Sequence, residues 1–253
     1  MAVKARTETI EIATLDDSTI RYSAPFQPQG PTTWRKLHDA DYGKNPLTGE
    51  PLRQQTFPEA VRMFNFAQAH KCNQTYVPII QAVNTTILTG NSLLLWTPES
   101  LYGVDFPDEE LVAQLGVDDQ STFSRIETKL QDRLSKRKRI GEHVRLSQDG
   151  FVRYTPSQNI IYNKQDSDIL ATNPATIVET GTLQNSHGAA RSSKQYPNKP
   201  FLYGLQDVQG ATVRVPGLFG DFGDRLNLGG RGVYDNRCSF GGTSAGEASA
   251  RKK

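Results

Sequence analysis

The sequence predicts an α+β protein, and three observations lead to this fold class. Three segments within the first 140 residues carry the apolar spacing and the end signals of helices. After residue 140, turn residues separate short apolar runs, as in short strands joined by long loops. Residues 204–246 contain 11 of the 21 glycines among large apolar side chains, which predicts an ordered, irregular β segment. We therefore expect a partly helical N-terminal region over 1–140 and a second domain over 141–253.

The first 55 residues predict a hairpin followed by irregular chain. Residues 7–14 alternate between polar and apolar side chains, which predicts a half-exposed strand. Residues 18–22 are its expected partner, because Asp16 and Asp17 suit the turn between them. The segment 23–55 contains five prolines and is expected to lie irregularly over the surface.

Helices are predicted over 56–71, 107–115 and 121–139. The first begins with Thr56 and Glu59 at the spacing of a capping box. The second ends at Gly116, and the third has an apolar residue every three or four positions from Phe123 to Leu134. Residues 76–96 predict a helix or strand followed by a strand over 93–96.

The second half is expected to contain strands and loops. The apolar runs 151–154, 160–162 and 176–178 are interpreted as short strands. The polar segment 184–200 is expected to be a mobile loop. The last seven residues are expected to form a frayed tail.

The composition indicates a soluble globular protein. Hydrophobic residues make up 36% of the chain, charged residues make up 22%, and the net charge is +2. The longest apolar run, 92–96, is too short for a membrane span, and the polar N-terminus predicts no secretory signal. We expect expression in the cytoplasm and two free thiols, although Cys72 and Cys238 could in principle form a disulfide.

The sequence offers little evidence for catalysis. His38, His70, His143 and His187 are spread along the chain without metal-ligand spacing. No nucleophile elbow, Walker loop or zinc-protease motif is present, and paired carboxylates occur where turns and helix starts are expected. We therefore expect no enzymatic activity, no cofactor and no metal.

The basic run 136–139 has two interpretations. We expect it to end the third helix, where cations interact favourably with the helix dipole. A nucleic-acid patch is the alternative, and it is disfavoured because no aromatic residues are interleaved with the cations. A nucleic-acid partner is therefore not expected.

The glycine-rich segment contains the candidate binding residues. Aromatic and arginine side chains supply most of the binding energy in interfaces, and Tyr, Gly and Asn favour adaptable recognition. The alternative is an irregular loop that only covers the β core. The candidate residues are Phe219, Asp221, Phe222, Asp224, Arg225, Asn227, Gly229, Gly230, Arg231, Val233, Tyr234, Asn236 and Arg237.

Residues 224–242, DRLNLGGRGVYDNRCSFGG, resemble the C-terminal end of variable proteins that are diversified by retroelements. The resemblance implies a C-type lectin-like domain of the formylglycine-generating-enzyme variety over 141–253. It also implies that Leu226 and Leu228 are scaffold positions, that Phe240 and Gly241 precede the last strand, and that 215–240 is the hypervariable segment. The triplets of calcium-dependent lectins are absent, so calcium-mediated sugar binding is not implied.

Three functions follow as expectations. The first is a non-catalytic protein that binds a protein or cell-surface ligand, in the setting of a virus or prophage, an archaeal one included. The second is a structural virion or assembly protein, a homo-oligomer whose glycine-rich segment packs between subunits. The third, an enzyme of the formylglycine-generating type, is disfavoured because Cys238 is the one cysteine in the candidate site.

Overall fold

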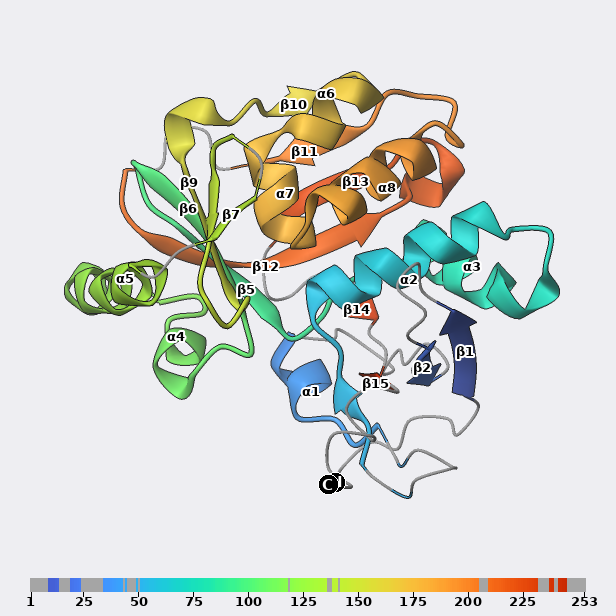
Figure 1. The fold of residues 1–253 in the computed structure, drawn as a ribbon, viewed down its shortest axis with the longest axis horizontal. Coiled ribbons are helices and arrows are strands. Elements are labelled where there is room, and N and C mark those ends of the chain that lie inside the picture. The colour runs from blue at the N-terminus through green and yellow to red at the C-terminus, as the bar shows by residue number, and fades with distance from the viewer. Residues whose placement is uncertain are drawn as a thin grey trace.

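Strands from residues 87–238 build one large mixed sheet (Figure 1). The structure is a computed structural model that describes residues 9–13, 19–23, 34–42, 44, 49, 51–117, 119–135, 138–140, 142–204, 209–231, 237–238 and 241–244. The sheet order is β10-β11-β13-β12-β5-β6-β9-β8-β7, and β4 pairs with β12 and with β14. Its strands are β4 (Ile87–Leu88), β5 (Ser92–Trp96), β6 (Ser100–Asp105), β7 (Lys138–Ile140), β8 (Val144–Leu146), β9 (Val152–Pro156), β10 (Asn163–Lys164), β11 (Phe201–Tyr203), β12 (Thr212–Phe219), β13 (Asn227–Arg231) and β14 (Arg237–Cys238).

A second sheet joins the two ends of the described chain. Its order is β1-β2-β15-β3, formed by β1 (Thr9–Ala13), β2 (Thr19–Ser23), β15 (Gly241–Ser244) and β3 (Arg53–Gln54). The antiparallel pairing of β1 with β2 confirms the predicted N-terminal hairpin. The predicted turn at Asp16 and Asp17 lies outside the described residues.

Helices cover both faces of the large sheet. They are α1 (Trp34–His38), α2 (Phe57–Ala69), α3 (Val77–Thr85), α4 (Glu109–Ala113), α5 (Gln120–Leu134), α6 (Ser167–Thr172), α7 (Pro174–Thr180) and α8 (Leu183–Ser193), with the 3-10 turns η1 (Gln74–Tyr76), η2 (Ser157–Asn159) and η3 (Asp221–Gly223). Figure 1 shows α4 and α5 on one side and α2, α7 and α8 on the other. Among the described residues, no helix is long and apolar enough to cross a membrane.

The longest apolar run of the sequence, 92–96, forms β5 in the interior of the large sheet. Leu94 and Trp96 pack into the core beneath α2, α7 and α8, whereas Leu93 and Leu95 pack into the core beneath α4 and α5. All four side chains are at most 1% exposed. A strand that is covered on both faces needs apolar residues at successive positions, because successive side chains point to opposite faces.

The expected boundary near residue 140 does not divide this fold. β5 and β6 precede it and pair with β12 and β9, which follow it. The second half is also more helical than expected. Residues 176–178, predicted as a strand, lie in α7, and much of the predicted loop 184–200 is α8. β-branched residues favour strands only weakly, and packing overrides that preference here.

The other predicted elements agree better with the structure. The capping box of Thr56 and Glu59 is formed at the start of α2, and α4 and α5 match the second and third predicted helices. However, α5 ends at Leu134, and Lys138–Ile140 forms β7 instead of the last helical turn. The expectation that 23–55 is irregular is wrong over α1, and the α1 side chain Trp34 is fully buried and donates to the Gly90 carbonyl at 2.9 Å.

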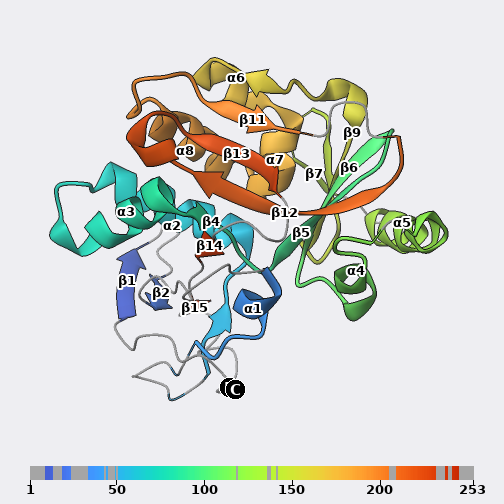
Figure 2. The ribbon, with the colours of Figure 1, turned by 180° about the vertical axis from the view of Figure 1, so that it is seen from behind.

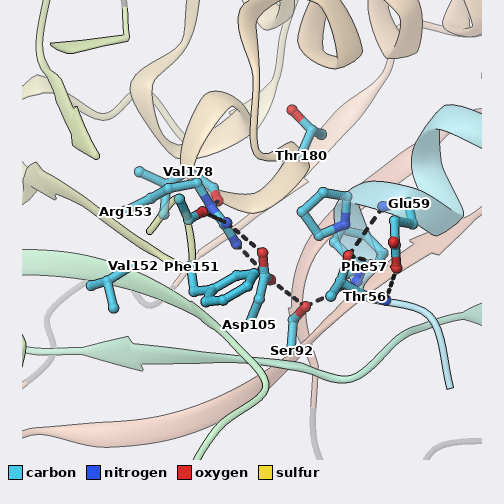
Figure 3. A network of polar contacts seen from close by, with 12 residues as sticks. Thr56, Phe57, Glu59, Ser92, Asp105, Phe151, Val152, Arg153, Val178 and Thr180 are labelled. Atoms are coloured by element: carbon cyan, nitrogen blue, oxygen red, sulfur yellow. Dashed lines mark hydrogen bonds and ion pairs between the residues drawn. The ribbon is translucent and has the colours of Figure 1, made fainter. Parts of the chain in front are cut away.

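A buried ionic network connects one end of the sheet to two helices (Figure 3). The Arg153 guanidinium donates to both oxygens of Asp105, at 2.6 and 2.8 Å, and to the carbonyl of Val178 in α7 at 2.6 Å. Ser92 Oγ donates to Asp105 at 2.6 Å and accepts from the backbone N–H of Phe57, at the start of α2, at 2.9 Å. The network therefore fixes β5, β6 and β9 relative to α2 and α7.

Candidate functional site

The strands β11, β13 and β12 carry a row of aromatic side chains on the face that turns away from α7 and α8. Asn227 pairs in register with Phe201 on one side and with Phe219 on the other, so these three residues share a face. Leu228 points to the opposite face, into the helix-covered core. Figure 2 shows these strands in front of α7 and α8. Phe201, Tyr203 and Phe219 are half-buried, so their rings remain accessible at this face.

The turn η3 adds the most exposed large apolar side chain among the described residues. Phe222 is 79% exposed, and its ring packs edge-to-face on Phe219 with centroids 5.7 Å apart. Asp221, Phe222 and Gly223 all have positive φ, at 44°, 54° and 91°. Non-glycine residues adopt this conformation at a cost, and such strain is found where the surroundings impose it. The backbone thus holds an aromatic ring out into solvent.

Contacts with distant segments hold this turn in place. The N–H of Gly220 donates to the Val83 carbonyl at the end of α3, 2.7 Å away. A Cβ on Gly220 would lie 2.1 Å from Asn84 Oδ1, so only glycine allows this approach. On the other side of the turn, the backbone N–H of Asn198 donates to the carbonyl of Asp224 at 3.1 Å. The conformation of the turn therefore does not depend on the Phe222 side chain.

The charges at the turn largely neutralise one another. Arg225 Nε lies 3.2 Å from Asp224 Oδ2 and 3.8 Å from Asp221 Oδ2. The three side chains are between 31% and 45% exposed, so each can exchange this partner for a ligand group. Phe219, Asp221, Phe222, Asp224 and Arg225 consequently form one continuous, accessible patch, and their predicted role in binding stays a prediction.

Three other residues that were predicted to bind ligand lie in the strand β13, outside the accessible patch. Asn227 is only 2% exposed, and Gly229 is buried at a φ of 137° with the position of its absent Cβ 2.1 Å from the Tyr203 carbonyl oxygen. Neither can present a variable side chain without rearranging the sheet. A Cβ on Gly230 would face Trp96 Nε1 at 3.1 Å, on the helix-covered side. These three positions belong to the scaffold, together with Leu226 and Leu228, which are buried as expected.

The remaining predicted positions are only partly within the described chain. Arg231 is the last residue of β13 and pairs with Val215, and Arg237 begins β14 and pairs with Ile87. Val233, Tyr234 and Asn236 lie outside the described residues, as do Phe240 and the C-terminal tail.

Sequence reasoning missed two members of the aromatic row. The rings of Phe201 and Tyr203 lie tilted against each other with centroids 4.4 Å apart, and the buried Leu202 lies between them in β11. The alternation of Phe201, Leu202 and Tyr203 is a strand signal that could have revealed them. Their place beside Phe219 depends on the parallel pairing of β11 with β13, which joins segments more than 20 residues apart.

The histidines and cysteines of the described chain form no chemical cluster. Across the described residues, no group of three His, Cys, Asp or Glu side chains could hold a metal ion. His70 stacks on Phe66 with ring centroids 4.1 Å apart, and His38 contacts Asp39 at 3.0 Å. The thiol of Cys72 is free and exposed.

Replacing Phe222 by glycine and by alanine should reveal the strain at the turn. Both changes remove the ring, but only glycine adopts a φ of 54° freely, so we expect F222G to be more stable than F222A by about 1 kcal/mol. Urea unfolding measures the difference. At Phe219, in a regular strand, the order should reverse, with alanine more stable than glycine. The same order at both positions would contradict the strained turn.

Comparison with known proteins establishes the fold. No protein-family model matches the chain, and neither does any curated protein. The chain is similar to a solved structure described as "Accommodation of massive sequence variation in Nanoarchaeota by the C-type lectin fold", with a TM-score of 0.52 and 13% identity. The superposition covers 94% of this chain and 97% of that one. The chain has a C-type lectin fold. Because the match spans nearly the whole chain, the similarity is not confined to residues 141–253.

Proposed function

We propose that this protein is a non-catalytic ligand-binding protein that presents a variable surface on its C-type lectin scaffold. The observation that carries the proposal is the accessible aromatic patch of Phe201, Tyr203, Phe219 and Phe222, which β11, β12 and the turn η3 present beside the glycine-rich strand β13. Exposed aromatic groups that cluster on a rigid support are typical of binding hot spots.

The contacts that hold the candidate surface in place would allow its side chains to vary. The turn η3 and the strands beside it are held by main-chain hydrogen bonds and by buried leucines, and not by Phe219, Asp221 or Phe222. Substitution at such positions costs little stability, whereas substitution in the core costs several kcal/mol. The similar solved structure concerns sequence variation in this same fold, and this supports the proposal by analogy.

We further propose that a retroelement diversifies the residues of this surface. The resemblance of 224–242 to the end of such variable proteins supports it, as does the placement of accessible candidate residues around buried Leu226 and Leu228. In this proposal the protein is made in the cytoplasm and acts as a component of a virus or prophage particle that contacts a protein or cell-surface ligand.

The competing assembly role has less support. It requires the glycine-rich segment to be available for packing against another subunit. Within the described residues, β15 is already paired with β2 and β3 of the same chain, and β13 is paired on both sides. Light scattering would favour the assembly role if it found a large closed oligomer that was lost on deletion of residues 204–253.

A library experiment tests the scaffold part of the proposal without knowledge of the ligand. Randomising Phe219, Asp221, Phe222, Asp224 and Arg225 together should leave most variants folded, as measured by protease resistance of displayed protein. Randomising five buried positions of the same region, Leu218, Leu226, Asn227, Leu228 and Gly229, should leave few folded. Similar survival of both libraries would remove the basis for a tolerant surface.

The retroelement part has its own test in the genomic locus. We expect a reverse-transcriptase gene nearby and a near-copy of the codons for 215–240 that differs where the copy has adenine. A locus without a repeat, together with related isolates that do not vary in this segment, would refute diversification. The tolerance of the surface to substitution would still be tested by the library experiment.

A further inference from the structure

Positive charge is concentrated in the sequence of the β7–β8 hairpin and in the two residues that precede it. Residues 136–145 contain five Lys or Arg and one acidic residue, so this segment carries +4 while the chain as a whole carries +2. The expected explanation, cations at the C-terminal end of a helix, does not apply. Helix α5 ends at Leu134, and the run continues into the strand β7. The charges therefore need a different explanation.

The pairing of the hairpin brings two of these cations together. Arg139 of β7 is directly opposite Arg145 of β8, so both side chains lie on the same face. Arg139 is exposed, and Arg145 is half-buried. Like charges directly opposite each other destabilise a sheet. An anion between them would remove this repulsion.

An aromatic ring fixes one of the two guanidinium groups. Arg145 lies over the ring of Tyr154 in β9, with its Cζ 4.3 Å from the ring centroid. Tyr154 in turn packs on Tyr102, whose hydroxyl donates to Glu127 of α5 at 2.7 Å. The aromatic partner that the sequence around 136–139 lacks is thus supplied by a neighbouring strand.

Neighbouring cations differ from this pair because they are neutralised within the chain. Arg125 and Lys129 of α5 both form ion pairs with Glu110, and Arg133 pairs with Asp149 at 2.8 Å. Within the described part of the chain, neither Arg139 nor Arg145 forms an ion pair. Glu142, in the loop of the hairpin, is 87% exposed and contacts His143 at 3.8 Å.

We propose that the Arg139–Arg145 pair on the β7–β8 hairpin binds the phosphate backbone of a nucleic acid. A backbone phosphate carries a full negative charge and can accept from both guanidinium groups at once. The continuous run of cations along 136–139 also suits a chain of successive phosphates better than scattered acidic side chains. This surface is separate from the aromatic patch, and the proposal does not depend on the proposed function.

Salt-dependent binding to a mixed-sequence single-stranded DNA oligonucleotide tests the proposal. We expect the double variant R139Q/R145Q to bind about tenfold more weakly near 50 mM salt, and the slope of log K against log salt to fall by about 1.4, because two phosphate contacts are lost. The single variant R139Q, which changes an exposed side chain, should lose part of this affinity without loss of thermal stability.

The control variant R35Q/R191Q removes two exposed arginines from α1 and α8, with the same change of net charge. It should bind as the unmodified protein does. Equal weakening by both double variants, or no salt-dependent binding by the unmodified protein, would overturn the proposal. Displacement of the oligonucleotide by polyglutamate at an equal concentration of charge would overturn it in favour of an acidic protein partner. Equally tight, Arg139-dependent binding to phosphatidylserine vesicles would overturn it in favour of a membrane surface.

Discussion

Replacing Asp105 by alanine should destabilise the fold by about 3–5 kcal/mol, because it leaves the Arg153 charge buried without its partner. Arg153 is 2% exposed, so water cannot take the place of the carboxylate. Ser92 would also lose its acceptor, which would disturb its contact with the first N–H of α2. A loss of this size is a large part of the total stability of a typical domain. Urea unfolding at neutral pH measures it.

Two further variants serve as controls for the effect of Asp105→Ala on stability. Asp149→Ala breaks the ion pair with Arg133, whose side chains are 39% and 44% exposed, and should cost at most about 1 kcal/mol. The double variant D105L/R153M removes both buried charges and should be less destabilised than D105A, because no charge remains unpaired. If D105A and D149A lost similar stability, or if D105A stayed more stable than the double variant, the network would not have the role assigned to it.

The elements that were predicted correctly carry their signals in local sequence. The start of α2 is an example, because Thr56 and Glu59 satisfy each other's backbone groups within one helical turn. Strand β5 was recognised from its continuous apolar run. Such signals are short-range and need no knowledge of the partner element. They establish the α+β class but not the order of strands in the sheet.

Helix α8 was missed because its buried face is made of small residues. Gly188, Ala189 and Ala190 give no strong apolar period, yet they allow a close approach to α2, where a Cβ on Gly188 would lie 2.4 Å from Asn65 Nδ2. The close packing of two helices produces this pattern, and one segment alone does not reveal it. The same limit applies to β7, whose strand conformation depends on its pairing with β8.

The candidate site shows the same limit. Composition drew attention to Phe219 and Phe222, because large aromatic residues in a glycine-rich segment are unusual for a linker. Composition could not show that Asn227 is buried or that Phe201 lies beside it, since both facts follow from strand register. Register is determined by pairing between distant segments, so a pattern within 215–240 cannot reveal it.

The stability of the protein should fall as pH rises from about 5 to 8, because Glu179 is buried as a neutral acid. Its side chain lies in α7 against the sheet, is 1% exposed, and has no hydrogen-bond partner for either oxygen among the described residues. Burial raises the pKa of Glu179 well above its usual 4.5, and the nearby carboxyl helps to raise the pKa of Tyr162. Arg153, which donates to the carbonyl of the adjacent Val178, is already paired with Asp105.

The linkage between protonation and folding determines how the stability of the protein changes with pH. A carboxyl whose pKa is raised in the folded state contributes its full stability at pH values below the unfolded-state pKa, near 4.5. As pH rises from there toward the folded-state pKa, this contribution is lost at up to about 1.4 kcal/mol per pH unit. Asp119 and Asp149 have a lowered pKa of about 2, so their contribution is lost only as pH falls below about 4 and does not enter this range. The interval between pH 5 and 8 therefore isolates Glu179 when variants are compared.

Glu179→Gln keeps the shape of the side chain and removes its titration. We expect this variant to be more stable than the unmodified protein at pH 8, by an amount that shrinks toward pH 5. Glu142→Gln removes the same charge from a side chain that is 87% exposed, and it should leave the pH dependence unchanged. A constant difference between E179Q and the unmodified protein across this range would mean that Glu179 does not change its protonation there. Because α7 packs against β13, which lies between the strands that carry Phe201 and Phe219, loss of the proton would also weaken the packing behind the aromatic patch.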